Sequence, residues 1–263
     1  RCAALGARAV VPRLAVVMVG EDDASVAYVA GMRRLAGTIG IDVTLEVLAR
    51  GIDDRGVRAV LRRYAADPLA HGVILQQPLP APLSIRRIAS AMPARKDVDG
   101  TNPVNQGRLA FASGARFVPA TPAAVMLLLE RSERRRLRGR DVTVIGRSNV
   151  VGLPVSLLLM ARDATVTVVH KETLGIVEHV RRAEIVVVAA GAPHLVDASW
   201  LRHGATVIDV GTTLVAGKLL GDVDFESART VASEITPVPG GVGPVTNVAL
   251  MRNVIRAAEL NSG

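Results

Sequence analysis

The sequence predicts an α/β protein built as two domains, each with a sheet of parallel strands covered by helices. Short apolar runs rich in valine and isoleucine alternate with helical patterns along almost the whole chain. In the second half of the chain these runs are continuously apolar, which is typical of strands buried on both faces of a sheet. At 263 residues the chain also exceeds the usual range of a single core, so we expect two domains.

The first part of the chain repeats a strand followed by a helix three times. The apolar β-branched runs are "LAVVMVG", "VTLEVL" and "HGVILQQ", and helical spacing of apolar residues fills the segments after them. A helix after each strand is the pattern of parallel βαβ units. We expect strands at 14–20, 43–48 and 71–77, and helices at 24–37, 53–67 and 84–92.

A polar, turn-rich stretch follows at 93–114, with the sequence "PARKDVDGTNPVNQGRLAFASG". It is long for a connection without secondary structure. Long loops in compact domains are often functional. We therefore expect this loop to carry part of a site.

A second alternating block begins after a helix at 121–132. Its strands are continuous apolar runs, as a doubly wound sheet requires. A glycine loop and a last helix within 235–260 close the chain. The expected strands are 141–146, 165–170, 184–191 and 206–211, and the expected helices are about 151–161, 175–182 and 197–203.

Composition limits the class of protein. Hydrophobic residues make up 49% of the chain, which is ample for packed cores and argues against disorder. No apolar run reaches about 18 residues, so we expect no membrane span. Cys2 is the only cysteine, which excludes an internal disulfide and favours a cytoplasmic location.

The net charge of +8 comes almost wholly from arginine, because Lys96, Lys171 and Lys218 are the only lysines. Such a balance fits nucleic acid, a small polyanionic ligand or an arginine-rich coding bias. The basic residues are spread out, apart from "ERRRLRGR" at 133–140, and aromatic residues make up only 2% of the chain. Stacking platforms for bases are therefore scarce, and we expect no nucleic-acid partner.

A candidate phosphate site lies in the second block, in "VTVIGRSNVVGLPVSLLL". This segment predicts a strand, a tight turn with Gly146 and Gly152, and a helix with Pro154 in its first turn. Backbone N–H groups at a helix N-terminus attract phosphate, and glycine allows its close approach. The motif is not G-x-G-x-x-G, so an ordinary turn between strand and helix is the alternative.

The end of the next strand bears on which dinucleotide fits. An acidic residue there binds ribose hydroxyls, whereas a basic residue accepts a 2′-phosphate. The strand ends "VVHKET", which offers both Lys171 and Glu172. Lys171 with Arg147 favours NADP, Glu172 disfavours it, and an ordinary solvated strand end is the alternative for both.

Five further stretches occur in order along the chain: "ILQQPLP" (74–80), "KDVDGTNPVNQGRL" (96–109), "PATP" (119–122), "IGRSNVVGLP" (145–154) and "TPVPGGVGP" (236–244). Together they closely resemble the methylenetetrahydrofolate dehydrogenase/methenyltetrahydrofolate cyclohydrolase family. The resemblance covers nearly the whole chain, from about Leu14 to Asn253.

This resemblance implies a three-layer α/β folate-binding catalytic domain, a Rossmann-like NAD(P)-binding domain and a cleft between them. The catalytic domain would comprise residues 1–120 and 245–263, and the cofactor domain residues 121–244. The implied activity is hydride transfer from 5,10-methylenetetrahydrofolate to NADP or NAD, then hydrolysis of the 5,10-methenyl product to 10-formyltetrahydrofolate. A homodimer is implied, with "TVTVVH" (165–170) in the pairing region, and no metal.

The resemblance also implies roles for individual residues. Tyr28 would orient the folate, Gln76 would hydrogen-bond the neighbouring catalytic side chain, and Asp99 would accept hydrogen bonds from the pterin. The plainer alternatives are that Tyr28 is a half-buried core residue, that Gln76 only closes a turn, and that Asp99 caps a turn. The remaining implied residues are Leu75, Gln77, Pro239, Gly240, Gly241, Val242 and Gly243 for substrate, and Gly146, Arg147, Ser148, Val151, Gly152, Lys171 and Thr212 for cofactor.

One position departs from the family pattern. The family has Y-x-x-x-K in the helix that carries Tyr28, and here Met32 stands at the lysine position. The family's lysine handles the proton in hydrolysis, and methionine has no such proton. Arg33 and Arg34 lie about 100° and 200° further round a helix, and arginine is a poor general base. We therefore expect the cyclohydrolase step to be weak or lost.

Three hypotheses remain. The first is a folate-linked NAD(P) dehydrogenase, which depends less on the lysine because hydride transfer is mainly positioning. The second is a catalytically silent or specialised paralogue that binds a folate-like ligand, which Met32 favours. Ala120, where the family often has Cys or Ser, and Glu172, where a basic residue is common, also point to specialisation. The third, a nucleic-acid-binding protein, is disfavoured by Gln76, Asp99 and "PGGVGP".

Overall fold

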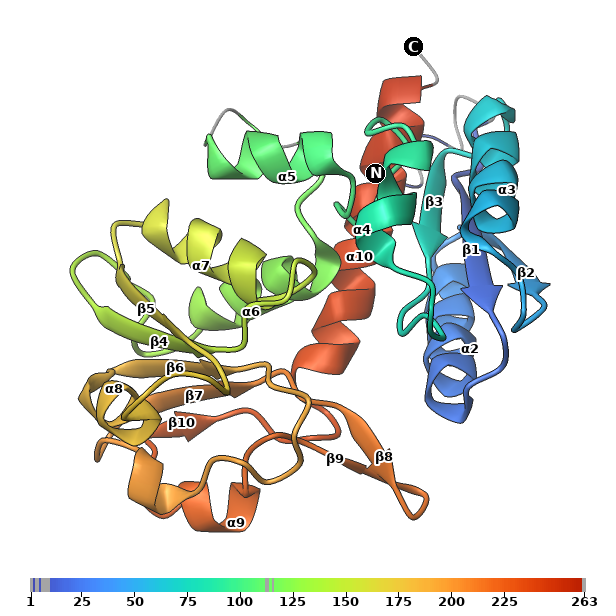
Figure 1. Ribbon diagram of the computed structural model, residues 1–263. Helices are drawn as coiled ribbons and strands as arrows, with labels where there is room; N and C mark the ends of the chain where they lie inside the picture. Colours follow the sequence, from blue (N-terminus) through green and yellow to red (C-terminus); the bar gives the residue numbers. More distant parts are fainter. Residues whose placement is uncertain (1, 3–4, 6–9, 112–113, 115, 262–263) are drawn as a thin grey trace. The chain divides into compact units, whose positions relative to one another are not determined.

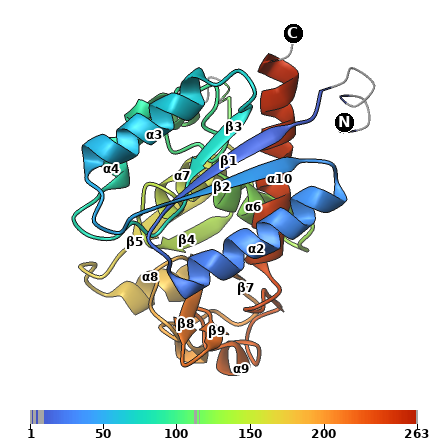
Figure 2. The same cartoon turned by 90° about the vertical axis from the view of Figure 1, so that its right-hand side faces the viewer.

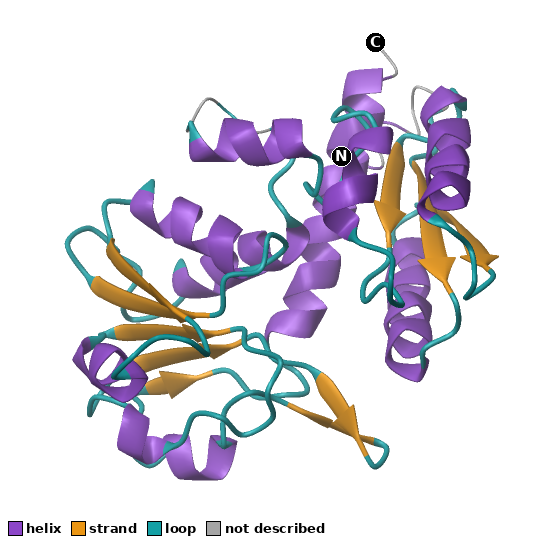
Figure 3. Cartoon of the chain, in the orientation of Figure 1, coloured by secondary structure: helices purple, strands orange, loops and turns teal. Residues whose placement is uncertain are grey.

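The computed structural model describes residues 2, 5, 10–111, 114 and 116–261 (Figure 1). The chain divides into two compact units. The first consists of Arg1–Ala120 and Asn247–Gly263, and the second of Thr121–Thr246. Figure 3 shows helices and strands alternating within both units, as the sequence pattern predicts. No described helix is long and apolar enough to cross a membrane.

The first unit is built on a three-stranded parallel sheet with the order β2-β1-β3. Its elements are β1 (Arg13–Val19), β2 (Asp42–Leu48), β3 (Gly72–Leu75), α2 (Asp23–Thr38), α3 (Asp54–Ala66), α4 (Ile85–Ile88), the 3₁₀ turn η1 (Ala89–Ala91), α5 (Pro103–Ala110) and part of α10 (Val242–Asn261).

Helices cover both faces of this sheet. Alternate strand residues, such as Val17 and Val73, pack with Val57 and Leu61 of α3 and with Ile88 of α4. Figure 2 shows α3 and α4 on one side of the sheet, and α2 and α10 on the other. The first unit is therefore a three-layer α/β fold, because burying both faces requires helices on each.

The second unit contains a five-stranded parallel sheet with the order β10-β7-β6-β4-β5. Two buried clusters lie on its faces, one with α6 and α7 and the other with α8 and α9, as Figure 1 also shows. The elements are β4 (Asp141–Ile145), β5 (Thr165–Val169), β6 (Ile185–Val188), β7 (Thr206–Asp209), β10 (Glu234–Ile235), α6 (Ala120–Leu129), α7 (Gly152–Met160), α8 (Ile176–Arg182), η2 (Ala198–Trp200) and α9 (Phe225–Ala228).

Some sequence expectations for the fold were wrong or incomplete. The stretch 93–114 is not one long loop, because α5 begins within it. Asn102 caps this helix by accepting a hydrogen bond from the backbone N–H of Val104 at 2.7 Å, and Pro103 occupies the first turn. Asparagine followed by proline is a helix-start signal. The helix expected at 197–203 is only the 3₁₀ turn η2.

The sequence reading also missed an antiparallel hairpin, β8 (Thr213–Val215) and β9 (Lys218–Leu220). Its two turn residues, Ala216 and Gly217, both have positive φ, at 48° and 78°. Two positive φ angles are the mark of a type I′ hairpin turn. Strands of three residues are too short to show a period-2 pattern, so only the glycine signalled this turn.

Candidate functional site

In both units the strand order reverses next to the first strand. β1 has β2 on one side and β3 on the other, and β4 has β5 and β6. Ligands bind in open parallel sheets at such points, beyond the carboxyl ends of the strands. Two predicted residues, Gln76 and Gly146, directly follow β3 and β4. Each unit therefore presents a candidate half-site where the sequence analysis expected one.

The first half-site brings Tyr28 and Asp99 together. Tyr28 lies in α2 and is partly buried. Burial, together with the nearby charge of Asp99, raises the pKa of the Tyr28 phenol well above its usual value. The Asp99 carboxylate accepts a hydrogen bond from the backbone N–H of Ala120. Burial and the charge of Asp97 raise the pKa of Asp99 to about 7. At neutral pH Tyr28 therefore keeps its proton, and Asp99 is poised to gain or lose one.

A hydrogen-bonded turn holds the Asp99 backbone in place. The neighbouring Asp97 is fully buried. Its carboxylate accepts hydrogen bonds from the N–H and hydroxyl of Thr101 at 3.0 and 3.1 Å, from the N–H of Asn102 at 2.8 Å and from the amide of Asn105 at 2.7 Å. Sequence reasoning singled out Asp99 and missed Asp97, which organises the loop.

A second missed residue, Asn253 of α10, fixes the same region from another side. Its amide nitrogen donates to the carbonyl oxygens of Val98 at 2.8 Å and Val118 at 2.9 Å. Gly100, with φ of +65°, packs so closely that a Cβ there would lie 2.8 Å from the nitrogen of Pro119. The turn carrying Asp99 is therefore locked on both flanks.

The glutamine turn after β3 is also well ordered by hydrogen bonds. The Gln76 N–H donates to the carbonyl of Val17 at 2.8 Å, and its side-chain amide donates to the carbonyl of Gln77 at 2.7 Å. The hydroxyl of Ser25 approaches the same carbonyl at 3.4 Å. Leu75 is 3% exposed and packs in the core beneath α3 and α4, whereas Gln76 and Gln77 are partly exposed.

Met32 is wholly buried, at 0% exposure. Val29 and Ala36, which share its side of α2, are buried as well, and Tyr28 lies at the margin of this stripe. Arg33 and Arg34 are exposed. Position 32 is thus a fully buried, apolar environment filled by a thioether.

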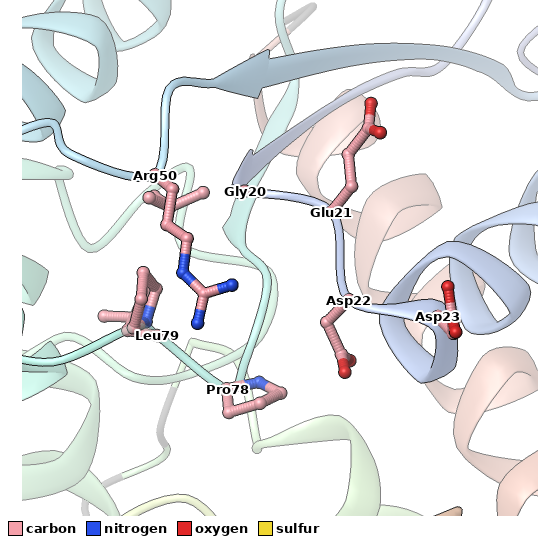
Figure 4. Close-up of a pocket in the computed structure, with 9 residues that line it drawn as sticks. Gly20, Glu21, Asp22, Asp23, Arg50, Pro78 and Leu79 are labelled. Carbon is pink, nitrogen blue, oxygen red and sulfur yellow. The ribbon is translucent and has the colours of Figure 1, made fainter.

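A cavity of about 360 Å³ lies at the carboxyl ends of β1, β2 and β3 (Figure 4). The guanidinium of Arg50 points toward Asp22, whereas the side chain of Glu21 points away from both residues. The residues expected at the reaction site, Tyr28, Met32, Gln76 and Asp99, do not line this cavity. Its lining residues are Val19, Gly20, Glu21, Asp22, Asp23, Arg50, Pro78, Leu79 and Pro80.

In the second half-site the two glycines are required by packing. A Cβ on Gly146, whose φ is +113°, would lie 2.1 Å from the carbonyl oxygen of Ala189. A Cβ on Gly152 would lie 2.1 Å from the carbonyl oxygen of Gly146. The Ser148 hydroxyl accepts hydrogen bonds from the N–H groups of Val151 at 3.1 Å and Gly152 at 3.5 Å. The start of α7 therefore stands directly against the strand ends, a backbone cradle suited to phosphate.

The charged residues expected near the cofactor are on the surface. Arg147 is exposed. Lys171 forms an ion pair with Glu172 at 3.7 Å, and both side chains are largely exposed. Such a pair is weak, so Glu172 only partly offsets Lys171. Thr212 is exposed directly before β8.

The glycine loop before α10 is tightly packed. A Cβ on Gly241 would lie 2.5 Å from the carbonyl oxygen of Pro237. Val242 is buried against the core beneath α6 and α7, while Pro239 and Gly240 are exposed and Gly243 is partly exposed. Among the described residues, no group of three or more His, Cys, Asp or Glu side chains is placed to hold a metal ion.

The strand reversal and glycine cradle of Thr121–Thr246 define a nucleotide-binding α/β domain. Comparison with known families extends this. Residues 119–262 match tetrahydrofolate dehydrogenase/cyclohydrolase, NAD(P)-binding domain, and residues 1–99 match the catalytic domain of the same family. The chain therefore belongs to the tetrahydrofolate dehydrogenase/cyclohydrolase family, and its cofactor domain is an NAD(P)-binding domain.

Individual relatives cover nearly the full chain. The Bifunctional protein FolD 1 of Frankia casuarinae is 47% identical over 255 residues, covering 97% of this chain and 91% of the relative. The crystal structure of the bifunctional enzyme FolD from Campylobacter jejuni superposes with a TM-score of 0.92 at 36% identity, covering 98% and 92%. FolD from Trypanosoma brucei, solved with NADP and an inhibitor, gives 0.91 at 39% identity, covering 95% and 88%. The expected family and two-domain α/β architecture are confirmed.

Proposed function

We propose that this member of the family oxidises 5,10-methylenetetrahydrofolate to 5,10-methenyltetrahydrofolate with NADP, and that its cyclohydrolase step is weak or lost. One observation carries the proposal. The Tyr28 and Asp99 pair is kept, while the helix turn after Tyr28 carries a buried methionine instead of an ionisable group. The first feature supports binding and orientation, and the second removes a proton-handling group.

The oxidation makes few demands on side-chain chemistry. A hydride leaves the methylene carbon, and the resulting cation is shared by the two adjacent nitrogens, so no protein group has to accept a proton. Positioning is then the main task. Ionised Asp99 accepts hydrogen bonds from pterin N–H groups, Tyr28 presents an aromatic face, and Gln76 fixes the edge of the ring.

Hydrolysis is different, because water adds to the methenyl carbon and a proton must reach the departing ring nitrogen. The thioether of Met32 carries no proton. The raised pKa of Tyr28 keeps its phenol protonated, so it cannot act as the base, and makes it a weak proton donor. Lys96 is buried elsewhere and donates to the backbone carbonyls of Tyr64 and Asp67. General acid–base catalysis typically contributes about 10²–10⁴-fold, which is the loss we expect.

The glycine cradle fits a dinucleotide, because Gly146 and Gly152 leave no side chain between the strand ends and the first turn of α7. When bound, the nicotinamide accepts the hydride. Arg147 and Lys171 supply positive charge for a 2′-phosphate, and the Lys171–Glu172 pair is exposed and weak. We therefore favour NADP over NAD, in keeping with the Trypanosoma brucei relative solved with NADP.

A homodimer and a cytoplasmic location complete the proposal. β5 is an edge strand of its sheet, and Val168 on it is 39% exposed. Unpaired edges with exposed apolar residues favour pairing with another chain. Sedimentation of the wild type and of Val168→Lys tests this: we expect a dimer that the variant weakens, and a wild-type monomer would refute it.

The decisive experiment follows both steps in one assay. Purified protein is mixed with methylenetetrahydrofolate and NADP, or NAD, and the absorbance of reduced cofactor and of methenyltetrahydrofolate is recorded separately. We expect both to rise together and the methenyl product to accumulate. Rapid enzymatic conversion to 10-formyltetrahydrofolate would contradict the loss of hydrolysis.

The alternative is a catalytically silent paralogue that binds a folate-like ligand, which the buried Met32 favours. It predicts folate binding by calorimetry without turnover with either cofactor. The same protein preparation distinguishes the two readings, because binding is measured whether or not the hydride moves.

A further inference from the structure

A buried carboxylate in the second unit holds the loop that follows β6. Asp222 is 0% exposed. Its carboxylate accepts hydrogen bonds from three consecutive backbone N–H groups, those of Ala190 at 2.7 Å, Gly191 at 2.8 Å and Ala192 at 2.8 Å. Hydrogen bonds to an ionised acceptor are the strong ones. A single side chain therefore fixes three successive residues of this loop.

A second buried carboxylate fixes the first. Asp209, at the end of β7, accepts hydrogen bonds from the N–H groups of Gly211 at 2.9 Å, Asp222 at 3.1 Å and Val223 at 3.0 Å. Burial raises the pKa of Asp209 to about 6, and the charge of Asp222 adds to this effect. The two aspartates thus form a ladder from β7 to the loop after β6.

Two glycines make room for this ladder. A Cβ on Gly211 would lie 2.3 Å from Cγ of Asp222, and a Cβ on Gly221 would lie 2.0 Å from Oδ2 of Asp209. Two buried carboxylates held only by N–H donors are costly, since no cation compensates them in the bonds described. Because burying these two carboxylates costs free energy, we expect them to hold a segment in position.

The held loop lies beside the glycine turn of the second half-site. The Ala189 N–H donates to the carbonyl of Ile145 at 2.8 Å, and the Ala189 carbonyl lies where a side chain on Gly146 would be. The loop therefore abuts the glycine turn at the point of strand reversal. Three N–H groups of the loop are occupied by Asp222, and the Ala192 carbonyl accepts a hydrogen bond from the Leu195 N–H at 3.3 Å. The groups that the loop can offer a ligand are therefore the carbonyl oxygens of Ala190 and Gly191.

We propose that Asp222, supported by Asp209, is a positioning residue that sets the 190–192 loop as a wall of the cofactor site and leaves the carbonyl oxygens of Ala190 and Gly191 to accept from the hydroxyl and amide donors of the dinucleotide. This inference rests on the proposed function in assigning the cofactor to this site. It requires only cofactor binding, not folate turnover. Asp222 itself touches no reacting atom.

The test compares Asp222→Asn with a matched control, Asp224→Asn. Both residues lie in "GDVD", and Asp224 accepts a hydrogen bond from the Ser227 N–H at the start of α9. Asparagine keeps the shape but cannot accept from three N–H groups as an ionised carboxylate does. The full-length protein is titrated with NADP by calorimetry, without folate, below the start of thermal unfolding.

We expect Asp222→Asn to raise the dissociation constant of NADP about tenfold, while the dissociation constant of folate, from a separate calorimetric titration, changes less than about twofold. Asp224→Asn should bind NADP as the wild type does. A folded Asp222→Asn protein with unchanged NADP affinity overturns the inference, as does an equal loss of affinity for both ligands, which a merely structural role would produce. If Asp222→Asn does not fold, Asp209→Asn is tested in the same assay, and we expect its affinity for NADP to be about threefold lower than that of the wild type. A wild type that binds NADP but does not oxidise folate would contradict the proposed function and leave this test valid.

Discussion

Introducing a lysine at position 32 tests the proposed role of this helix face in the first half-site most directly. Met32→Lys places an amine one helical turn after Tyr28, in an environment that is 0% exposed. Burial lowers the pKa of an amine, and a fall of about 3 units would bring this lysine near 7.5, a useful value for proton transfer. We expect methenyl hydrolysis to rise by about 10²-fold or more, the lower end of general acid–base catalysis.

The same substitution destabilises the fold by an amount that depends on pH. A downward shift of about 3 units corresponds to about 4 kcal/mol at pH 7, a large part of the usual stability of a domain. Since the unfolded lysine binds more protons than the folded one between about pH 7.5 and 10.4, the stability of the variant should rise with pH over this range relative to wild type. Urea unfolding at pH 7 and pH 9 measures the difference.

Two controls accompany this variant. Arg33→Lys places the same amine on the neighbouring exposed position, and Met32→Leu changes the buried side chain without adding an amine. Neither should accelerate hydrolysis. A folded Met32→Lys protein whose hydrolysis rate equals that of Arg33→Lys would refute the assignment of this helix face to proton transfer.

The remaining predictions concern Asp99 and Asn253 in the first unit and the glycine turn at Gly146 in the second. The difference in unfolding free energy between the wild type and Asp99→Asn should fall from pH 4 to pH 7 and stay level above pH 7. The reason is that the raised pKa of Asp99, about 7, favours the protonated carboxyl in the folded state. Urea unfolding of both proteins across this pH range measures the difference, and a difference independent of pH would contradict the prediction. In the wild type, the KM for folate should fall as pH rises through 7. Gly146→Ala should lose NADP affinity and at least about 2 kcal/mol of stability, because its Cβ would lie 2.1 Å from a carbonyl oxygen. The control is Gly107→Ala, in open space within α5, which should be neutral or stabilising by about 0.5–1 kcal/mol. Calorimetric titration with NADP and urea unfolding measure both variants. Asn253→Ala should raise the KM for folate and cost about 1–3 kcal/mol, whereas Asn261→Ala, whose bond to backbone is longer and more exposed, should do neither.

The sheets were predictable because a buried parallel strand has to be apolar on both faces. "VTVI" and "IVVV", for example, leave no polar face that would suit a surface helix. Helix α5 was hidden because apolar spacing is weak in "PVNQGRLA", and only the preceding Asn102 announced its start. Where the local signal lies in one capping residue or one turn glycine, periodicity alone does not reveal the element.

For the site, residues in continuous motifs were accessible to sequence reasoning and residues that act at a distance were not. Tyr28 and Asp99 were singled out by the resemblance, and their mutual electrostatic influence is a feature of the structure. Asn253 lies 155 residues from Val98, whose carbonyl it binds, and Asp222 lies about thirty residues from its loop. Nothing in the local sequence around an asparagine or a buried aspartate specifies such a partner.

The clamp formed by Asn253 also sets an order of events during synthesis. The turn that carries Asp99 emerges from the ribosome early, but one of the groups that locks it belongs to the last helix, α10. A nascent chain that has not yet reached α10 therefore presents this turn without the Asn253 hydrogen bonds, however well its first sheet has formed. A ligand that binds this turn can therefore stabilise the completed first unit by mass action only after α10 has been made.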